Sequence, residues 1–108
     1  MHKLQKFFEA KLSKRLSYRV TTGNRDFTEV YERMYRLEVV AADDTAVDFL
    51  VTSFDIVPAG GKLGGTDKGF GTVTVPFGDS VEAMVKSAAA TSDPTFFKKY
   101  PDAEGAAA

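Results

Sequence analysis

Few residue types in this chain could carry out covalent or metal-dependent chemistry. The 108 residues include no cysteine, and the one histidine, His2, lies beside the start of the chain. Cysteine nucleophiles, disulfides and thiolate metal sites are therefore excluded, and neither a histidine triad nor a histidine-based zinc site is expected. The sequence predicts a protein without enzymatic activity and without a cofactor, and no motif indicates a small-molecule substrate.

Four aspartates form the main group of carboxylates that could bind a metal ion or transfer protons: Asp43, Asp44, Asp48 and Asp55. Asp48 and Asp55 differ by an odd number of positions, so on a regular strand their side chains point to opposite faces. Asp43 and Asp44 lie in a turn-like segment, where aspartate is favoured for its local hydrogen bonds. The group therefore predicts neither a metal site nor an acid–base pair.

A glycine-rich segment, residues 59–71, could surround a phosphate, because glycine lets backbone amides approach an anion. Its spacing does not fit, since a P-loop needs a Gly-Lys-Ser/Thr run before a helix, and Gly69-Phe70-Gly71 lacks the third glycine of the dinucleotide fingerprint. We interpret the segment as a loop between strands that becomes ordered on contact with a protein partner, including a second copy of the chain. Its predicted contact residues are Gly60, Gly61, Lys62, Gly64, Gly65 and Lys68.

Three aromatic residues near the C-terminal end, Phe96, Phe97 and Tyr100, complete this candidate protein interface. Exposed aromatic side chains in a cluster would mark a docking surface. The alternative is that these side chains close the core of a small domain.

A second candidate site is a group of basic residues that could contact an anion or the phosphates of single-stranded nucleic acid: Lys3, Lys6, Lys11, Lys14, Arg15 and Arg19. Tyrosines next to arginines, as in Tyr18-Arg19 and Tyr35-Arg36, could stack on unpaired bases. The chain has no tryptophan, so its nine phenylalanines and four tyrosines must also supply the core. Core packing is thus the competing interpretation for these tyrosines.

The charges are unevenly distributed along the chain. Residues 1–36 carry nine Lys or Arg against four Asp or Glu (+5), and residues 37–108 carry five against eleven (−6), which gives the net charge of −1. A chain polarised in this way can pair the positive part of one copy with the negative part of another, unless folding mixes the charges. The near-zero net charge argues against a dedicated nucleic-acid binder.

The spacing of apolar residues predicts the elements that position these sites. Residues 2–16 have helical spacing with lysines between the apolar positions, and predict a basic amphipathic helix that covers a sheet or lies on an anionic surface. Apolar and polar residues alternate over 16–22 and 72–77, which predicts strands. Residues 46–57 carry apolar side chains on both faces, which predicts a central strand with both faces partly covered. Pro76 places the last strand at a sheet edge or at its own end.

Residues 27–40 allow two interpretations. Aromatic and β-branched residues favour a strand, at least from Tyr35 to Val40, whereas a capping pattern and charge pairs four residues apart leave a helix over 26–34 as an alternative. Asp79 is the predicted start of a C-terminal helix, and Pro94 begins one more helical turn.

The predicted fold is α+β: an N-terminal amphipathic helix, a three- to four-stranded antiparallel meander sheet, and a C-terminal helix packed on one sheet face. Residues 1–101 are predicted to form a single domain, and residues 102–108, which have nothing to pack, a disordered tail.

Composition supports a function in assembly. No apolar run reaches the roughly 18 residues of a membrane span, and no signal peptide is recognised, so we expect a cytoplasmic protein or a component of a macromolecular assembly. The first functional hypothesis is a non-enzymatic structural or assembly protein that acts through protein–protein contacts, as a homo-oligomer or within a larger assembly such as a virion. The alternative is a single-stranded nucleic-acid-binding protein.

Overall fold

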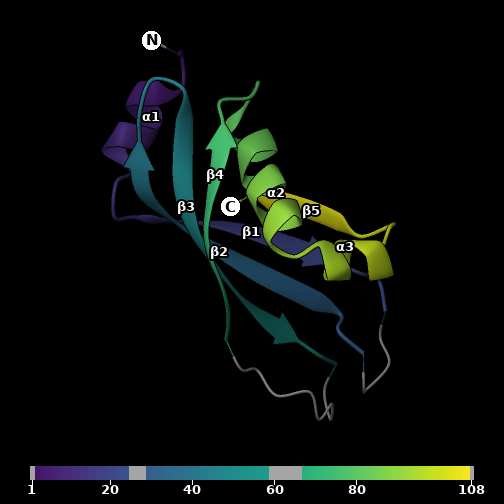
Figure 1. Ribbon diagram of the computed structural model, residues 1–108. Helices are drawn as coiled ribbons and strands as arrows, with labels where there is room; N and C mark the ends of the chain where they lie inside the picture. The colour runs from purple at the N-terminus through teal and green to yellow at the C-terminus, as the bar shows by residue number, and fades with distance from the viewer. Residues whose placement is uncertain (1, 25–28, 59–66, 108) are drawn as a thin grey trace.

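The computed structural model describes residues 2–24, 29–58 and 67–107 (Figure 1). In chain order the elements are α1 (Gln5–Ala10), β1 (Arg15–Thr21), β2 (Glu32–Ala42), β3 (Ala46–Ile56), β4 (Lys68–Pro76), α2 (Val81–Ser92), α3 (Pro94–Lys99) and β5 (Glu104–Ala107). The predicted α+β class with an antiparallel sheet is confirmed. No helix in the described ranges is long and apolar enough to cross a bilayer.

The described strands form one five-stranded sheet in the order β4-β3-β2-β1-β5, with every neighbouring pair antiparallel. Strands β1 to β4 follow the predicted meander, and β4, which ends in Pro76, lies at an edge. The fifth strand was not predicted. Glu104–Ala107 pair with β1 instead of forming a disordered tail, because the free edge of β1 offers backbone hydrogen-bonding partners to a segment with little strand propensity of its own.

The ambiguous segment before residue 40 is a strand. Residues Glu32–Ala42 form β2, which confirms the strand predicted from Tyr35 to Val40, and Tyr35, Leu37 and Val39 are buried on one face. The alternative interpretation, a helix over 26–34, is wrong for the residues of this range that the structure describes. Glu32 to Met34 already pair with β1 and β3. Residues 25–28 lie outside the described residues.

The N-terminal helix is much shorter than predicted. It ends at Ala10, and Leu12 makes an isolated bridge to Val39. Ser13 adopts a positive φ of 66°, a left-handed conformation that cannot continue a helix, and β1 then begins at Arg15. Of the predicted apolar stripe, Phe8 is fully buried whereas Leu12 is 43% exposed.

Helix α2 begins one residue later than predicted. Ser80, rather than Asp79, is its N-cap, and the Ser80 hydroxyl accepts a hydrogen bond of 3.0 Å from the Ala83 amide. Pro94 occupies the first turn of α3, where its missing N–H is tolerated. Asp93, between the two helices, ends α2 and begins α3.

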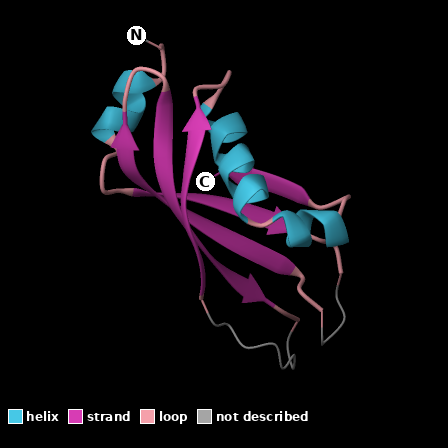
Figure 2. Cartoon of the chain, in the orientation of Figure 1, coloured by secondary structure: helices cyan, strands magenta, loops and turns pink. Residues whose placement is uncertain are grey.

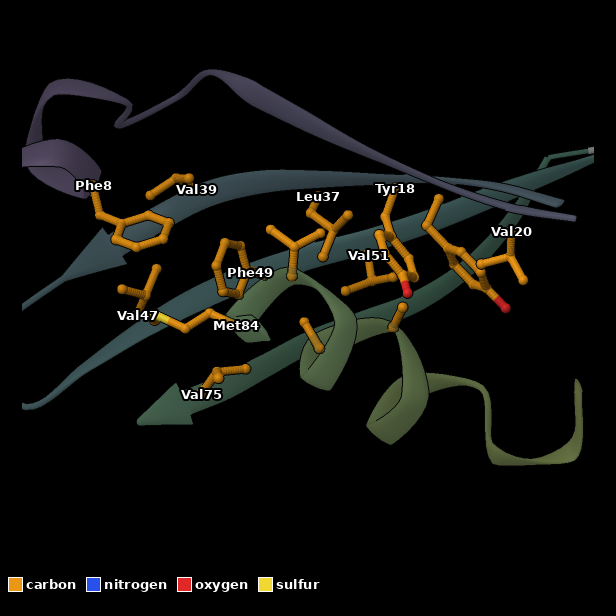
Figure 3. Packing of buried hydrophobic residues seen from close by; sticks show 14 of the residues in the cluster. Phe8, Tyr18, Val20, Leu37, Val39, Val47, Phe49, Val51, Val75 and Met84 are labelled. Carbon is orange, nitrogen blue, oxygen red and sulfur yellow. The ribbon is translucent and has the colours of Figure 1, made fainter. Parts of the chain in front are cut away.

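The core lies between the helices and one face of the sheet. Val47, Phe49 and Val51 alternate along β3 towards this face, and Met84 of α2 lies beside them (Figure 3). Val85 of α2 belongs to the same cluster. Phe8 of α1 joins the same cluster, with its ring 5.7 Å from that of Phe49. Figure 2 shows α2 lying along the sheet beside β4 and β5. Burial of each large side chain contributes about 1.5–3 kcal/mol to folding.

The opposite face of the sheet has no helix on it in the part of the chain that the structure describes. We call it the open face. The positions that alternate with the buried ones define it: Arg15, Ser17 and Arg19 of β1, Glu32, Met34, Arg36 and Glu38 of β2, Asp48, Leu50, Thr52, Phe54 and Ile56 of β3, and Thr72 and Thr74 of β4.

Candidate functional site

Several predicted interface residues meet in a pocket of about 200 Å³ beside α3, at one end of the sheet. We call it the corner pocket. Its lining comes from the segment before β2, from β2 and β4, and from α3 with the residues that flank it, and consists of Val30, Arg33, Lys68, Asp93, Thr95, Phe96, Lys99 and Tyr100. Lys68, Phe96 and Tyr100 belong to the interface predicted from the sequence.

A hydrogen-bonded network of charged residues forms one wall of the corner pocket. Arg33 and its cross-strand partner Asp55 make a bidentate pair: Nε donates to Oδ1 at 2.5 Å and Nη2 donates to Oδ2 at 2.9 Å. Arg33 Nη1 also donates to Oδ2 of Asp93 at 2.7 Å. Burial disfavours the charge of Arg33, but the hydrogen bonds and charges of the two carboxylates outweigh burial and raise its pKa.

Asp93 is the most buried carboxylate of this network, with 4% of its surface exposed. Its Oδ2 also accepts a hydrogen bond of 2.7 Å from the hydroxyl of Tyr35, which is fully buried. Burial, followed by the hydrogen bond and the charge of Asp93, raises the pKa of Tyr35. The carboxylate thus joins the α2–α3 junction to the central strand, and Arg33 packs over the Phe96 ring at 4.3 Å.

The outer part of the pocket carries two lysines. Lys99 Nζ lies 3.6 Å from Oε2 of Glu29, which also accepts a hydrogen bond of 2.8 Å from the Tyr100 hydroxyl. Burial, and next the hydrogen bond to Glu29, raises the pKa of Tyr100. Lys68 lies over the Phe70 ring at 5.2 Å. Within the described ranges Lys68 has no carboxylate in ion-pair contact.

Part of the predicted aromatic interface of Phe96, Phe97 and Tyr100 belongs to the hydrophobic core. Phe96 is 4% exposed and packs in the core, which corrects the expectation that it is available to a partner. Phe97 stacks on Tyr35 with ring centroids 5.9 Å apart, and both Phe97 and Tyr100 are half-buried. The predicted loop residues Gly60, Gly61, Lys62, Gly64 and Gly65 lie outside the described residues.

The predicted basic site is divided between two regions of the molecule. Lys3, Lys6, Lys11 and Lys14 lie in and beside α1, with Lys11 over the Phe7 ring at 5.5 Å. Arg15 and Arg19 lie on the open face of β1. Each has a carboxylate on β2 as its partner, at 4.0 Å for Arg15 and Glu38 and at 3.8 Å for Arg19 and Glu32. Both arginines therefore already have an acidic partner.

The open face combines these ion pairs with apolar side chains. Leu50 and Ile56 are 38% and 39% exposed, and Met34 is the cross-strand neighbour of Phe54. Arg36 lies over the Phe54 ring at 4.7 Å and 3.6 Å from the carboxylate of Asp67. A depression of about 30 Å³ lies among Arg15, Arg36, Glu38, Leu50 and Thr52.

The sequence did not identify the network of Arg33, Tyr35, Asp55 and Asp93. The predicted divergence of two aspartates is confirmed: Asp48 lies on the open face, where Thr74 donates to it at 2.5 Å, and Asp55 faces Arg33 on the helix-covered side. One signal was available, because Arg33 shares the strand face of Tyr35 and a charge on a buried face requires partners. The identity of Asp93 as a partner depends on tertiary structure.

Comparisons of the chain with protein-family models, with curated proteins and with solved structures gave no match.

Proposed function

We propose that this protein is a non-enzymatic assembly protein that associates with further copies of itself through the open face of its sheet. The observation that carries the proposal is the one-sided arrangement of the described helices: α1, α2 and α3 pack on one face, and Leu50, Phe54 and Ile56 remain on the other. An apolar group surrounded by polar residues on one exposed surface is typical of a protein interface.

The charges of the open face also favour a protein partner. Three arginines, Arg15, Arg19 and Arg36, are balanced by three carboxylates, Glu32, Glu38 and Asp48. A surface that carries both signs can meet a second copy of itself without a net repulsion. It supplies little attraction for a polyanion, because binding to phosphates depends on an excess of unpaired basic residues. Single-stranded nucleic-acid binding therefore has less support than self-association.

The test compares two exposed leucines. Leu50→Lys places a charge on the open face opposite Glu38, the cross-strand neighbour of position 50. The new lysine therefore has a carboxylate partner within the monomer. Leu12→Lys makes the same change at a side chain of similar exposure outside the open face. Light scattering coupled to size exclusion should show an oligomer for the wild-type protein and for Leu12→Lys, and a folded monomer for Leu50→Lys. A wild-type monomer at every concentration would contradict the proposal, as would an equal effect of both substitutions.

A further inference from the structure

We propose that the corner pocket binds a small molecule that carries a carboxylate on an aromatic or aliphatic body. This inference is independent of self-association, because its residues belong to the pocket beside α3 and not to the open face.

The charges that line the pocket leave a place for an anion. Three cationic side chains, Arg33, Lys68 and Lys99, line it together with one carboxylate, Asp93. The charge of Asp93 is compensated within the network, since its Oδ2 accepts hydrogen bonds from Arg33 and Tyr35. Arg33 is paired with Asp55 as well, and Lys99 with Glu29, so Lys68 is the cation of the lining that lacks a carboxylate partner within the described ranges.

The two lysines are the groups that can reach a ligand. Lys68 comes from β4 and Lys99 from α3, and both line the same pocket. Lys68 contacts the face of Phe70 and has no ion-pair partner among the residues described. The Lys99 side chain is 63% exposed, and it shares the Glu29 carboxylate with the hydroxyl of Tyr100. A ligand carboxylate between the lysines would give Lys68 a charge-assisted hydrogen bond that it lacks in the described chain.

The apolar part of the lining fits the body of such a ligand. Tyr100 is half-buried and contributes aromatic surface, and the Thr95 hydroxyl adds one neutral polar group. Val30 and Phe96 also line the pocket, but they are only 9% and 4% exposed. The volume of about 200 Å³ is smaller than the roughly 300 Å³ at which pockets for drug-sized ligands begin, so the pocket fits a compact acid with a single ring or a short chain.

The wall of the pocket is held in place before a ligand arrives. Arg33 is fixed by two carboxylates and by packing against the Phe96 ring. A ligand therefore has to order only the two lysine side chains, which limits the entropy that binding costs.

Titration of the full chain with sodium benzoate, followed by amide NMR, tests the proposal. Benzoate should shift the amides of residues 93–100 and of Lys68 and reach saturation in the millimolar range, as expected for a ligand of this size. Benzamide, which has the same ring without the charge, should bind at least several-fold more weakly. Inorganic phosphate, which has charge without a ring, should also bind more weakly.

Two variants locate the site. Lys68→Gln should weaken benzoate binding several-fold, and Lys68→Gln combined with Lys99→Gln should abolish saturation. Lys86→Gln is the matched control, because Lys86 is an exposed lysine of α2 that does not line the pocket. The proposal is overturned if benzoate causes no saturable shift, if the double variant binds as the wild-type protein does, or if benzamide or phosphate binds as tightly as benzoate.

Discussion

Tyr35 and Asp93 are 58 residues apart in the sequence, and the Tyr35 hydroxyl donates a hydrogen bond of 2.7 Å to Oδ2 of Asp93. The same oxygen accepts a hydrogen bond from Arg33. Because Tyr35 and Arg33 belong to the central strand β2 and Asp93 to the junction of α2 and α3, this contact fixes the C-terminal helices on the sheet. Arg33 and Asp93 also line the corner pocket, so these two residues both stabilise the fold and shape the candidate site.

Replacement of Asp93 with alanine should destabilise the protein strongly. The change leaves the Tyr35 hydroxyl without its buried acceptor and removes one of the two carboxylates that compensate Arg33. We expect the free energy of unfolding to fall by about 3 kcal/mol, measured by chemical denaturation. Asp79→Ala, at an exposed aspartate before α2, is the control and should change stability little. A loss at Asp93 no larger than at Asp79 would show that the network does not stabilise the fold.

Removal of the Tyr35 hydroxyl should have a smaller effect that depends on pH. Tyr35→Phe keeps the ring contacts and loses one hydrogen bond to a charged acceptor, which costs about 1–2 kcal/mol at neutral pH. The pKa of Tyr35 is raised in the folded state, so the wild-type protein should lose stability as the pH rises above about 10, where the unfolded chain releases the phenol proton.

Denaturation curves between pH 8 and 11 distinguish the two proteins. Tyr35→Phe cannot lose this phenol proton, so the stability difference between wild type and variant should shrink across this range. A constant difference over the whole range would mean that the buried hydroxyl makes no contribution to the alkaline loss of stability.

Substitution of Gly105 should displace the C-terminal strand. A Cβ at this position would overlap the phenol ring of Tyr18, which is 2% exposed and cannot move away freely. We expect Gly105→Ala to reduce stability by about 1–3 kcal/mol and to increase the hydrogen exchange of the amides of β5. Ala106→Ser, at the exposed neighbouring position of the same strand, should leave exchange nearly unchanged. Equal protection of β5 in both variants would refute this close packing.

The parts of the fold that the sequence predicts are those with a regular local pattern. Val47, Phe49 and Val51 alternate with polar or exposed positions over a long strand, and period two is readable without knowledge of the partner strands. The end of α1 is different, because Ser13 leaves the helical conformation where the chain contacts β2 at Val39. That contact is tertiary and has no counterpart in the apolar spacing of the N-terminal segment.

For the candidate sites, too, contacts between segments far apart in the sequence could not be predicted. Lys68, Phe96 and Tyr100 were identified by their residue types and share one pocket, but Phe96 turned out to be a core residue. Arg33 and Asp93 were missed, since 60 residues separate them and neither lies in a motif. Pairing across such a separation depends on how α3 packs on the sheet. β5 was missed because Gly105 and its alanine neighbours have low strand propensity, and pairing with β1 is what makes them a strand.

The most direct measurement of self-association through the open face uses the absence of cysteine, which makes any introduced thiol unique. Thr72→Cys places a spin label at the margin of the open face, beside Leu50, and Lys86→Cys places one on α2, on the other side of the sheet. Packed sheets lie about 10 Å apart, so labels on facing surfaces interact through their dipoles. The account predicts a dipolar interaction between copies for the label at position 72 and a weaker one at position 86. No interaction at position 72, or a stronger one at position 86, would contradict it.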